Sequence, residues 1–507
     1  ASSMKKQVRM LIIITTAVLV LVALLLGLLF LLPGDEDEVS STIPESSDPT
    51  VNLISKNTVD QPVKKVIIKN DKEEFTIAHN DEKQFVVVGY EDLPINTIDI
   101  DSLIGSLANL TATRKISDDS SKEADFGLDK PRATATVTYH DDSVISIELG
   151  DEAAGDSGSY LRLGNEGEIY LVDSMFVSKL MQQSIVYIGT ELIVPPEIKE
   201  GDENAQAVMR SMKLSGSFRT GNPLSFSLYE NPDDIPLGST GYFIKTPKIK
   251  GTNEAVSAIA QSSSTLSAAQ AFIAHPTSAQ KKQYGLDKPY SVCEMTLGVQ
   301  TSAPSGEEDD TITTKYYGTT EHIIRLGKKD KDGNYYAMVD EYNAIYLVPE
   351  TSVPWVEVGY ADIVEKTLFM ISIGDVKSIS VQANDKKTTF ELTHFPDEED
   401  RDKNMVVKVD GKTYSTPEYR SLYQIFISIM RYGETNEKPK GEPVAVFSLK
   451  PISKDDPSVT ASFYKHSPSL YICKQEDGEI YTVKVNEVQK MLLEMENYLN
   501  GKSVNTN

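Results

Sequence analysis

Cysteine is nearly absent from this chain, which has 507 residues and only two cysteines, Cys293 and Cys473. So few cysteines exclude a fold that depends on a framework of disulfides. The two residues fall in predicted strands of two different repeats. A long-range bridge between them and two separate buried thiols both stay open, and we favour the buried thiols.

Positive charge is also in short supply. The chain has 50 Lys and Arg against 75 Asp and Glu, which gives a net charge of -25. A nucleic-acid-binding protein needs a basic surface, so this class is excluded. An acidic surface is repelled by anionic lipid headgroups and is expected to stand away from the bilayer. Hydrophobic residues make up 40% of the chain, which is enough to build folded cores.

Recognisable catalytic and metal-binding patterns are missing. The six histidines are scattered, and none has metal-ligand spacing to another His, Cys or carboxylate. There is no Gly-x-Ser-x-Gly nucleophile elbow and no Gly-x-x-x-x-Gly-Lys-Ser/Thr phosphate loop. Ser462 and Lys465 have a penicillin-binding spacing, but they lie in an alternating strand pattern. We therefore predict that the protein is not an enzyme and has no catalytic residue, metal or cofactor.

Acidic clusters offer only weak alternatives. Asp330, Asp332 and Asn334 partly resemble a calcium loop, but Tyr335 stands where that loop requires glycine, so we predict a hairpin turn. Residues 307–310 and 397–402 are interpreted as solvated loops, with weak cation binding or partner contact as the minority reading.

The chain has one long apolar run, residues 10–32, which carries no charged residue. At about 1.5 Å per residue such a helix spans the hydrocarbon core of a bilayer. The run is longer than the core of a cleaved signal peptide, so we predict a retained signal anchor in contact with membrane lipid. Lys5, Lys6 and Arg9 precede it, and the positive-inside rule places the N-terminus in the cytoplasm.

This orientation divides the chain into an inner and an outer part. Residues 1–9 form a cytoplasmic stub, and everything after the helix lies outside the cell. Residues 33–62 are rich in Ser, Thr, Pro and acids, which predicts a flexible acidic linker.

The remaining sequence repeats three times. Residues 166–172 read EGEIYLV, residues 342–348 read YNAIYLV and residues 477–483 read DGEIYTV. Each follows another alternating apolar segment across a short turn, which predicts a β-hairpin.

A second landmark occurs twice upstream of these hairpins. FGLDKP occupies residues 126–131 and YGLDKP occupies residues 284–289, whereas the third copy has diverged to EKPKGEP at this place. A helix is predicted before each, with Asp99 or Asp101 as N-cap of the first and Asn253 of the second. The N-cap of the third is expected at Thr416, with Pro417 at the first helical position.

The repeat unit is therefore strands, a helix, the turn and two hairpins. We predict repeat domains at residues 63–190 and 205–360, and a divergent repeat domain at 374–502. Strands joined by short turns form antiparallel sheets, and one helix per copy covers one face. The fold class is α+β.

The two turns have a structural and a functional interpretation. Glycine would supply a positive φ, leucine would enter the core and proline would begin a strand. In the functional interpretation, the Asp and Lys side chains would face a partner. We favour the structural role, because catalytic sites are seldom duplicated within one chain. The candidate residues are Gly127, Leu128, Asp129, Lys130, Pro131, Gly285, Leu286, Asp287, Lys288 and Pro289.

These landmarks resemble the bacterial domain-of-unknown-function family 4340, whose members carry the aromatic-Gly-Leu-Asp-Lys-Pro turn and the Ile-Tyr-Leu-Val strand. The matching residues are 126–131 with 169–172, and 284–289 with 345–348; the third copy matches only through residues 480–483 and the order of elements. The resemblance supplies no activity. It implies an anchored envelope protein that works with an ABC-type export system similar to the gliding-motility transporters.

We therefore expect a non-catalytic extracytoplasmic accessory or assembly subunit of an ABC-type transporter, which contacts the permease and auxiliary subunits. The alternative is an extracytoplasmic module that binds a solute, peptide or glycan between its domains. That alternative predicts a well-formed interdomain pocket with convergent polar groups, whereas the assembly function predicts a broad exposed patch.

Overall fold

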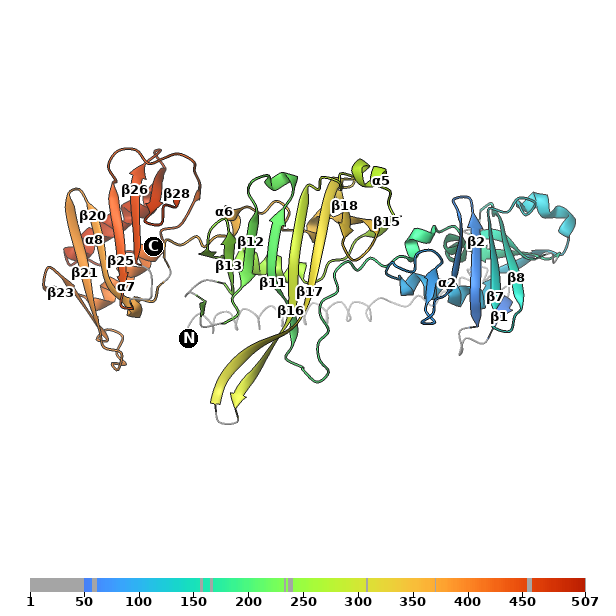
Figure 1. Ribbon diagram of the computed structural model, residues 1–507, viewed down its shortest axis with the longest axis horizontal. Helices are drawn as coiled ribbons and strands as arrows, with labels where there is room; N and C mark the ends of the chain where they lie inside the picture. The colour runs from blue at the N-terminus through green and yellow to red at the C-terminus, as the bar shows by residue number, and fades with distance from the viewer. Residues whose placement is uncertain are drawn as a thin grey trace, which may run out of the picture.

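The computed structural model describes residues 50–506 except 57–61, 156–157, 165–166, 232–233, 236–239, 307–308, 370 and 454–457. Three antiparallel sheets follow one another along the chain and lie in a row (Figure 1). They have eight, nine and nine strands, and helices accompany each sheet. The predicted α+β class with repeated sheet domains is therefore confirmed.

All three sheets share one strand order, except that the first lacks the outermost edge strand, which is β14 in the second and β23 in the third. In each, the first strand of the sheet domain pairs with the strand that follows the turn or, in the third domain, the diverged segment 437–443. The short strand after the helix closes the far edge beside the last hairpin. The first sheet has the order β4-β3-β2-β7-β8-β9-β10-β6. Its strands are β2 (Val63–Asn70), β3 (Glu74–His79), β4 (Phe85–Val87), β6 (Arg114–Ser117), β7 (Ala133–Tyr139), β8 (Val144–Glu152), β9 (Gly158–Leu163) and β10 (Ile169–Asp173).

The second sheet has the order β14-β13-β12-β11-β16-β17-β18-β19-β15. Its strands are β11 (Gln206–Ser215), β12 (Leu224–Leu228), β13 (Tyr242–Thr246), β14 (Lys250–Gly251), β15 (Gln270–Ala274), β16 (Ser291–Gly306), β17 (Asp309–Lys329), β18 (Asn334–Val339) and β19 (Ala344–Pro349). The paired β16 and β17 are much longer than their counterparts and project as an arm from this domain (Figure 1).

The third sheet has the order β23-β22-β21-β20-β25-β26-β27-β28-β24. Its strands are β20 (Val376–Ala383), β21 (Lys386–His394), β22 (Met405–Val409), β23 (Lys412–Tyr414), β24 (Gly433–Glu434), β25 (Ala445–Pro451), β26 (Val459–Lys465), β27 (Leu470–Gln475) and β28 (Ile480–Lys484). The sequence did not predict the short edge strands β6, β15 and β24.

Each sheet is covered on one face by a helix that follows its first strands. The α-helices of the described residues are α2 (Thr97–Ala108), α3 (Ser174–Leu180), α4 (Glu254–Ser263), α5 (Ser278–Gln283), α6 (Tyr360–Ile363), α7 (Thr416–Ile427) and α8 (Val485–Leu499). Short 3₁₀ turns are η2 (Ser120–Phe126), η3 (Ser184–Tyr187), η4 (Ser217–Arg219), η6 (Glu350–Ser352) and η7 (Ile373–Asp375).

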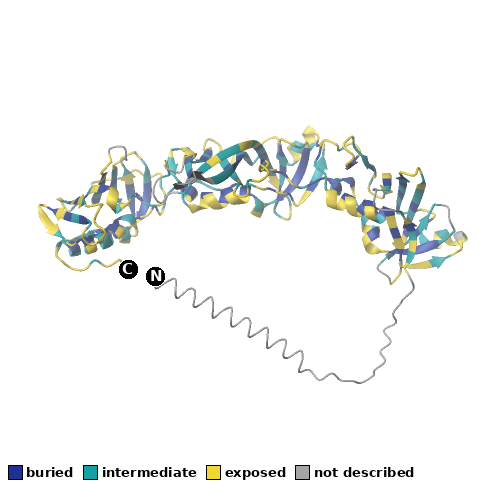
Figure 2. Cartoon of the chain, turned by 90° about the horizontal axis from the view of Figure 1, so that it is seen from below, coloured by how far each residue is buried: buried dark blue, intermediate teal, exposed yellow. Residues whose placement is uncertain are grey.

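Packing follows the alternation of the strands. In β7 every second side chain is buried, and these residues share one core with Ile100, Leu103 and Leu107 of α2. Such a pattern is what a sheet with one covered face requires. The buried segments gather in each of the three domains (Figure 2). Separate clusters around α4 and α7 form the second and third cores.

The helix starts are close to those predicted, and two caps differ. Asn253 caps α4, as predicted. The cap of α2 is Asn96 instead of Asp99 or Asp101, because its side-chain oxygen accepts the backbone N–H of Asp99. The cap of α7 is Ser415 instead of Thr416. Pro417 therefore occupies the second helical position, where its missing N–H is still harmless.

The predicted linker, residues 33–62, is not flexible throughout. Residues 51–55 form a strand, β1 (Val51–Ser55), that pairs with β5 (Asn109–Ala112) directly after α2. Ile54 is buried in the first core, which explains why this segment is ordered. The predicted stub at 1–9, the predicted helix at 10–32 and most of the linker lie outside the described residues. No helix in the described part of the chain is long and apolar enough to cross a membrane.

The cores do not follow the predicted domain limits closely. Ile188, Leu192 and Ile193 pack in the core of the second domain, and so does Leu93, which lies before α2 in the first. The segment between the first two domains is thus part of a packed junction.

Candidate functional site

The two Gly-Leu-Asp-Lys-Pro turns adopt the geometry that the structural interpretation requires. Gly127 and Gly285 have φ angles of +67° and +76°, in the left-handed region that favours glycine. The leucines that follow them, Leu128 and Leu286, are buried. The side chains of Asp129, Lys130, Asp287 and Lys288 are exposed. Pro131 and Pro289 do not begin a strand as predicted, because they lie two residues before β7 and β16. The partner contact of the exposed residues stays a prediction.

Each turn lies against a glycine of the neighbouring strand. A Cβ atom on Gly150 would overlap the carbonyl oxygen of Phe126. A Cβ atom on Gly327 would overlap the carbonyl oxygen of Tyr284, which accepts the backbone N–H of Lys328 (2.9 Å). The turn and the strand are therefore too close for any side chain between them.

The third copy differs on both sides of this contact. Ala133 pairs with Leu149 in the first domain and Ala445 pairs with Phe463 in the third. Tyr464 thus stands where the first domain has Gly150. The third copy lacks the turn, so nothing there demands a glycine.

The same turns connect the two repeated landmarks. The aromatic residue that precedes the glycine packs on a tyrosine of the repeated hairpin. The ring centroids of Phe126 and Tyr160 are 4.7 Å apart, and those of Tyr284 and Tyr336 are 4.3 Å apart. This contact explains why the turn and the hairpin recur together.

The other residues that the sequence raised as possible calcium-binding or catalytic groups have structural roles. Asp330 accepts the backbone N–H groups of Asp332 and Asn334 in the turn between β17 and β18, so the predicted hairpin turn is confirmed. Ser462 and Lys465 lie in strand β26, as expected. Within the described residues, no group of three or more His, Cys, Asp or Glu could hold a metal ion.

Both thiols are buried and free, which agrees with the favoured interpretation. Burial raises the pKa of Cys473 to about 12 and raises that of Cys293 as well. Neither thiol is an available nucleophile at neutral pH.

The two junctions between domains share one hydrogen-bond frame. Each connecting segment is held on one side by residues before the helix of its own domain. On the other side it is held by residues after the helix of the next domain. The first junction has Asn96 N–H to Tyr187 O (2.9 Å), Gly189 N–H to Pro94 O (2.7 Å), Leu192 N–H to Leu266 O (2.8 Å) and Ala268 N–H to Thr190 O (2.8 Å). The second has Asn253 N–H to Ile363 O (2.8 Å), Glu365 N–H to Gly251 O (3.0 Å), Leu368 N–H to Ile429 O (3.3 Å) and Arg431 N–H to Lys366 O (2.7 Å).

Each of the four hydrogen bonds at the first junction has a counterpart at the second, at the same place relative to the helix and the connecting segment. The capping asparagines repeat as well, since Asn96 donates its side-chain amide to Val186 O (3.1 Å) and Asn253 donates to Asp362 O (2.8 Å). Paired backbone groups on both sides of a connector restrict rotation between domains. The three domains are thus joined by a repeated, defined contact.

Side chains at the two junctions differ in chemistry. Leu93, three residues before the cap Asn96, is buried in the second core beside apolar residues. Lys250 occupies the equivalent position, three residues before Asn253. Its ammonium group forms ion pairs with Asp477 and Glu479 of the third domain. The buried contact is therefore apolar at the first junction, beside an exposed contact of His275 with Asp92 (2.9 Å), and ionic at the second.

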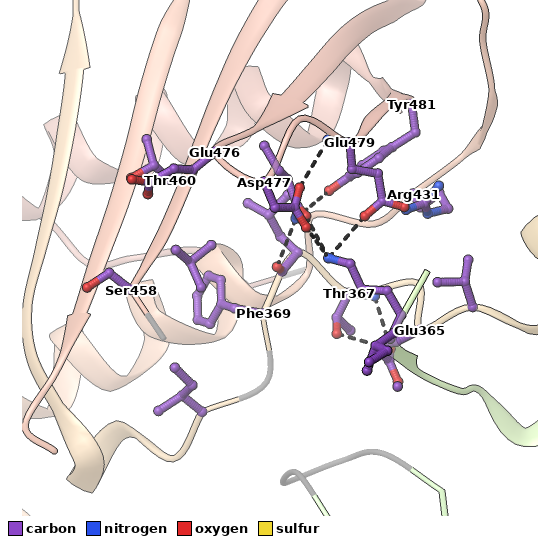
Figure 3. A pocket seen from close by; sticks show the side chains of 18 of the residues that line it. Glu365, Thr367, Phe369, Arg431, Ser458, Thr460, Glu476, Asp477, Glu479 and Tyr481 are labelled. Atoms are coloured by element: carbon purple, nitrogen blue, oxygen red, sulfur yellow. Dashed lines mark hydrogen bonds and ion pairs between the residues drawn. The ribbon is translucent and has the colours of Figure 1, made fainter. Parts of the chain in front are cut away.

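The ionic junction centres on Glu479, in the turn between β27 and β28. Its carboxylate pairs with Lys250 (3.0 Å) and with Arg431, and it accepts the hydroxyl of Tyr360 (2.8 Å). Asp477 of the same turn pairs with Lys248 (2.8 Å) and Lys250 (2.9 Å). The dashed lines of Figure 3 follow these contacts around Asp477, Glu479 and Arg431.

Electrostatics keeps this cluster ionised. Burial opposes the charge on Glu479, but Arg431 and Lys250 outweigh it and hold the pKa of this carboxyl below its usual value. The Arg431 side chain is only 5% exposed, and its guanidinium lies 4.0 Å from the centroid of the Tyr481 ring. Such a contact adds a cation–π attraction to the ion pair.

A cleft of about 720 Å³ opens beside this cluster, between the second and third domains. One side is apolar and includes Leu368, Phe369, Ile371 and Val459. Figure 3 shows Phe369 facing the space near Ser458 and Thr460, across from Asp477 and Glu479. The remaining carboxylates of the lining are Asp234, Glu365, Asp375 and Glu476.

None of these cleft residues belongs to the predicted candidate set. The cluster brings together residues near positions 250, 365, 431 and 477. These positions are far apart in the sequence, so no local sequence pattern predicts that they are in contact. The only available signal was the repeated hairpin itself, whose turn carries Asp477 and Glu479.

The fold defines a class of tandem-repeat α+β proteins. The profile described as Domain of unknown function (DUF4340) matches residues 86–199 and 244–420, which together make up more than half of the chain. The chain belongs to this family, as its resemblance predicted. No curated protein and no solved structure matches it.

Proposed function

We propose that this protein is a membrane-anchored, extracytoplasmic assembly subunit of an ABC-type transporter. Residues 10–32 anchor it as a single signal-anchor helix, with residues 1–9 in the cytoplasm and the three domains outside. The proposal includes no catalysis, because the sequence nominates no nucleophile, metal set or nucleotide-binding loop. Its direct partners are the permease and auxiliary subunits.

The proposal rests on one observation: the same chain has a long uncharged apolar run, residues 10–32, and a row of three domains joined by defined contacts. The run follows Lys5, Lys6 and Arg9 and precedes an acidic segment, which favours an outside ectodomain. The repeated hydrogen-bond frame supports an extended body that presents a long surface to other proteins. The transporter itself is inferred from what the family resemblance implies.

Affinity purification of the full-length protein from its native membranes in mild detergent tests this function. We expect an ATP-binding subunit and a permease to co-purify in a fixed ratio, identified by mass spectrometry. A matched control carries residues 10–32 replaced by an unrelated transmembrane helix. Recovery of the protein alone, even after crosslinking, would contradict the proposal.

A second candidate function is a binding module for a solute, peptide or glycan. The cleft between the second and third domains favours it, since ligand sites commonly lie between domains and occupy about 300–1,000 Å³. Its best-buried charged groups, Arg431 and Glu479, however, already pair with one another, and Glu479 also pairs with Lys250 across the junction. We therefore rank this candidate second, and a soluble ligand that stabilises the protein without any protein partner would reverse the order.

A further inference from the structure

We propose that the cleft between the second and third domains is the partner-docking surface, and that it receives a protein segment with a Lys or Arg side chain flanked by apolar side chains. This inference rests on the proposed assembly function and names its contact surface. It departs from the Gly-Leu-Asp-Lys-Pro turns, where the sequence placed the candidate contacts.

Charge is the first argument. Lys250 and Arg431 are the basic residues of the cleft lining, and both are already bound to Asp477 or Glu479. The other four carboxylates, of Asp234, Glu365, Asp375 and Glu476, form no ion pair with any described residue. The cleft therefore has an excess of negative charge that a cationic side chain complements.

The apolar wall is the second argument. Leu368 and Phe369 line the cleft from within the third core, where both are buried, Ile371 and Val459 are half-buried there, and Ile249 lies at the cleft with 74% of its surface exposed. An exposed isoleucine beside an apolar wall marks a surface that gains free energy when a partner covers it. Carboxylates next to apolar side chains select a segment that is basic and apolar together.

The third argument compares the two junctions. They share the same backbone frame, and the first is filled by the buried Leu93 and Ile193. At the second, Lys250 replaces the leucine and the neighbouring carboxylates line an open cleft. The first junction therefore joins its domains without a charged cleft. The charged cleft is an addition that the joining of domains does not need.

Site-specific photo-crosslinking tests the proposal in the full-length, membrane-embedded protein. A p-benzoylphenylalanine replaces Ile249, and a control replaces Val144, an exposed residue of the first domain. We expect a crosslink from position 249, with a Lys- or Arg-containing apolar segment identified by mass spectrometry. A crosslinked segment without a basic residue would overturn the proposal.

Charge reversal gives the matched variants. In the Ile249-substituted background, D375K with E476K should lower the crosslink yield about tenfold, because two attractive contacts become repulsive. D81K with E82K makes the same double change at an exposed turn of the first domain and should leave the yield unchanged. An equal yield in both variants would contradict the charge argument.

The outcomes separate this proposal from the assembly function. If transporter subunits co-purify but crosslink only from position 144, the docking surface is elsewhere and the assembly function stands. If no subunit co-purifies and position 249 does not crosslink, both fail.

Discussion

At the residue scale, the presence of the turn goes together with a glycine in the strand beside it, and the copy that lacks the turn has a tyrosine there. Gly150 and Gly327 lie under the two intact turns, where a Cβ atom has no room. Tyr464 takes the same place in the copy that has lost its turn. The glycine and leucine of the Gly-Leu-Asp-Lys-Pro sequence are explained by the positive φ, this close approach and the burial of the leucine. The partner contact of the exposed Asp and Lys stays a prediction.

Gly150→Ala should lower the free energy of unfolding of the first domain by about 1–3 kcal/mol, because the turn must move away from β8. Gly105→Ala is the control, since its Cβ would meet no atom within 4 Å in the middle of helix α2. That substitution should stabilise the domain by about 0.5–1 kcal/mol. Urea unfolding measures both, and a neutral Gly150→Ala would refute the close contact.

At the element scale, each asparagine cap both caps its helix and donates hydrogen bonds to the connecting segment. Asn253 accepts the N–H of Ala255 at the start of α4 and donates to Asp362 O and Val364 O in the connector. The cap thereby couples the start of a helix to the junction that follows its domain. Serine preserves the cap but lacks the amide donor.

Asn253→Ser should keep α4 intact and loosen the connector, at a cost of about 1 kcal/mol. Asn253→Ala should cost about 1 kcal/mol more, since the cap is lost as well. Hydrogen exchange resolves the two effects: the serine variant should raise exchange in residues 362–366 and leave the first turn of α4 protected. Identical exchange in the two variants would argue against the double role.

The stacked histidines of the first domain predict a pH dependence. His79 packs on Phe85 with centroids 3.9 Å apart and on His140 at 5.8 Å. Burial, and then the charge of His140, lower the pKa of His79. The unfolded chain therefore binds a proton more readily than the folded one. Stability is full above the unfolded value of about 6.5 and is lost as the pH falls through it.

Thermal unfolding at pH 7.5 and pH 5.5 checks this linkage. The midpoint of the first domain should be lower at pH 5.5, and His79→Gln should reduce the difference between the two. An undiminished difference in the variant would assign the effect to other groups.

The sequence predicted those elements that depend on neighbouring residues. The hairpins, the three covering helices and the turn geometry of Gly127 follow from alternation, helical spacing and turn chemistry. The edge strands β6, β15 and β24 have two to five residues and pair with a strand far along the chain, so no local pattern reveals them. The cleft residues come from six separate segments of the chain, so no local pattern reveals them either.

At the scale of the whole molecule, the three domains form a row with two equivalent junctions (Figure 1). β1 extends the scheme, because it pairs with the residues after α2 as the connectors pair with the residues after α4 and α7. Strand β1 is therefore paired with the first domain at the place where each connector is paired with the domain that follows it.

Lys250→Met should loosen the second junction and cost about 1–3 kcal/mol, since Glu479 and Asp477 lose a shared partner. Spin labels at K331C and K387C, both exposed, report the separation of the second and third domains. The distance distribution should broaden in the variant. Lys213→Met removes an exposed ion pair with Glu294 and should leave the distribution unchanged, at a cost within about 0.5 kcal/mol.

The account depends most on the claim that the domains stand outside the cell on one membrane helix. Labelling with a membrane-impermeant maleimide tests it directly, and the buried native thiols do not interfere. In intact spheroplasts, D81C should be labelled and K5C should be labelled only after lysis. Labelling of D81C only after lysis, or recovery of the protein without membranes, would contradict the account.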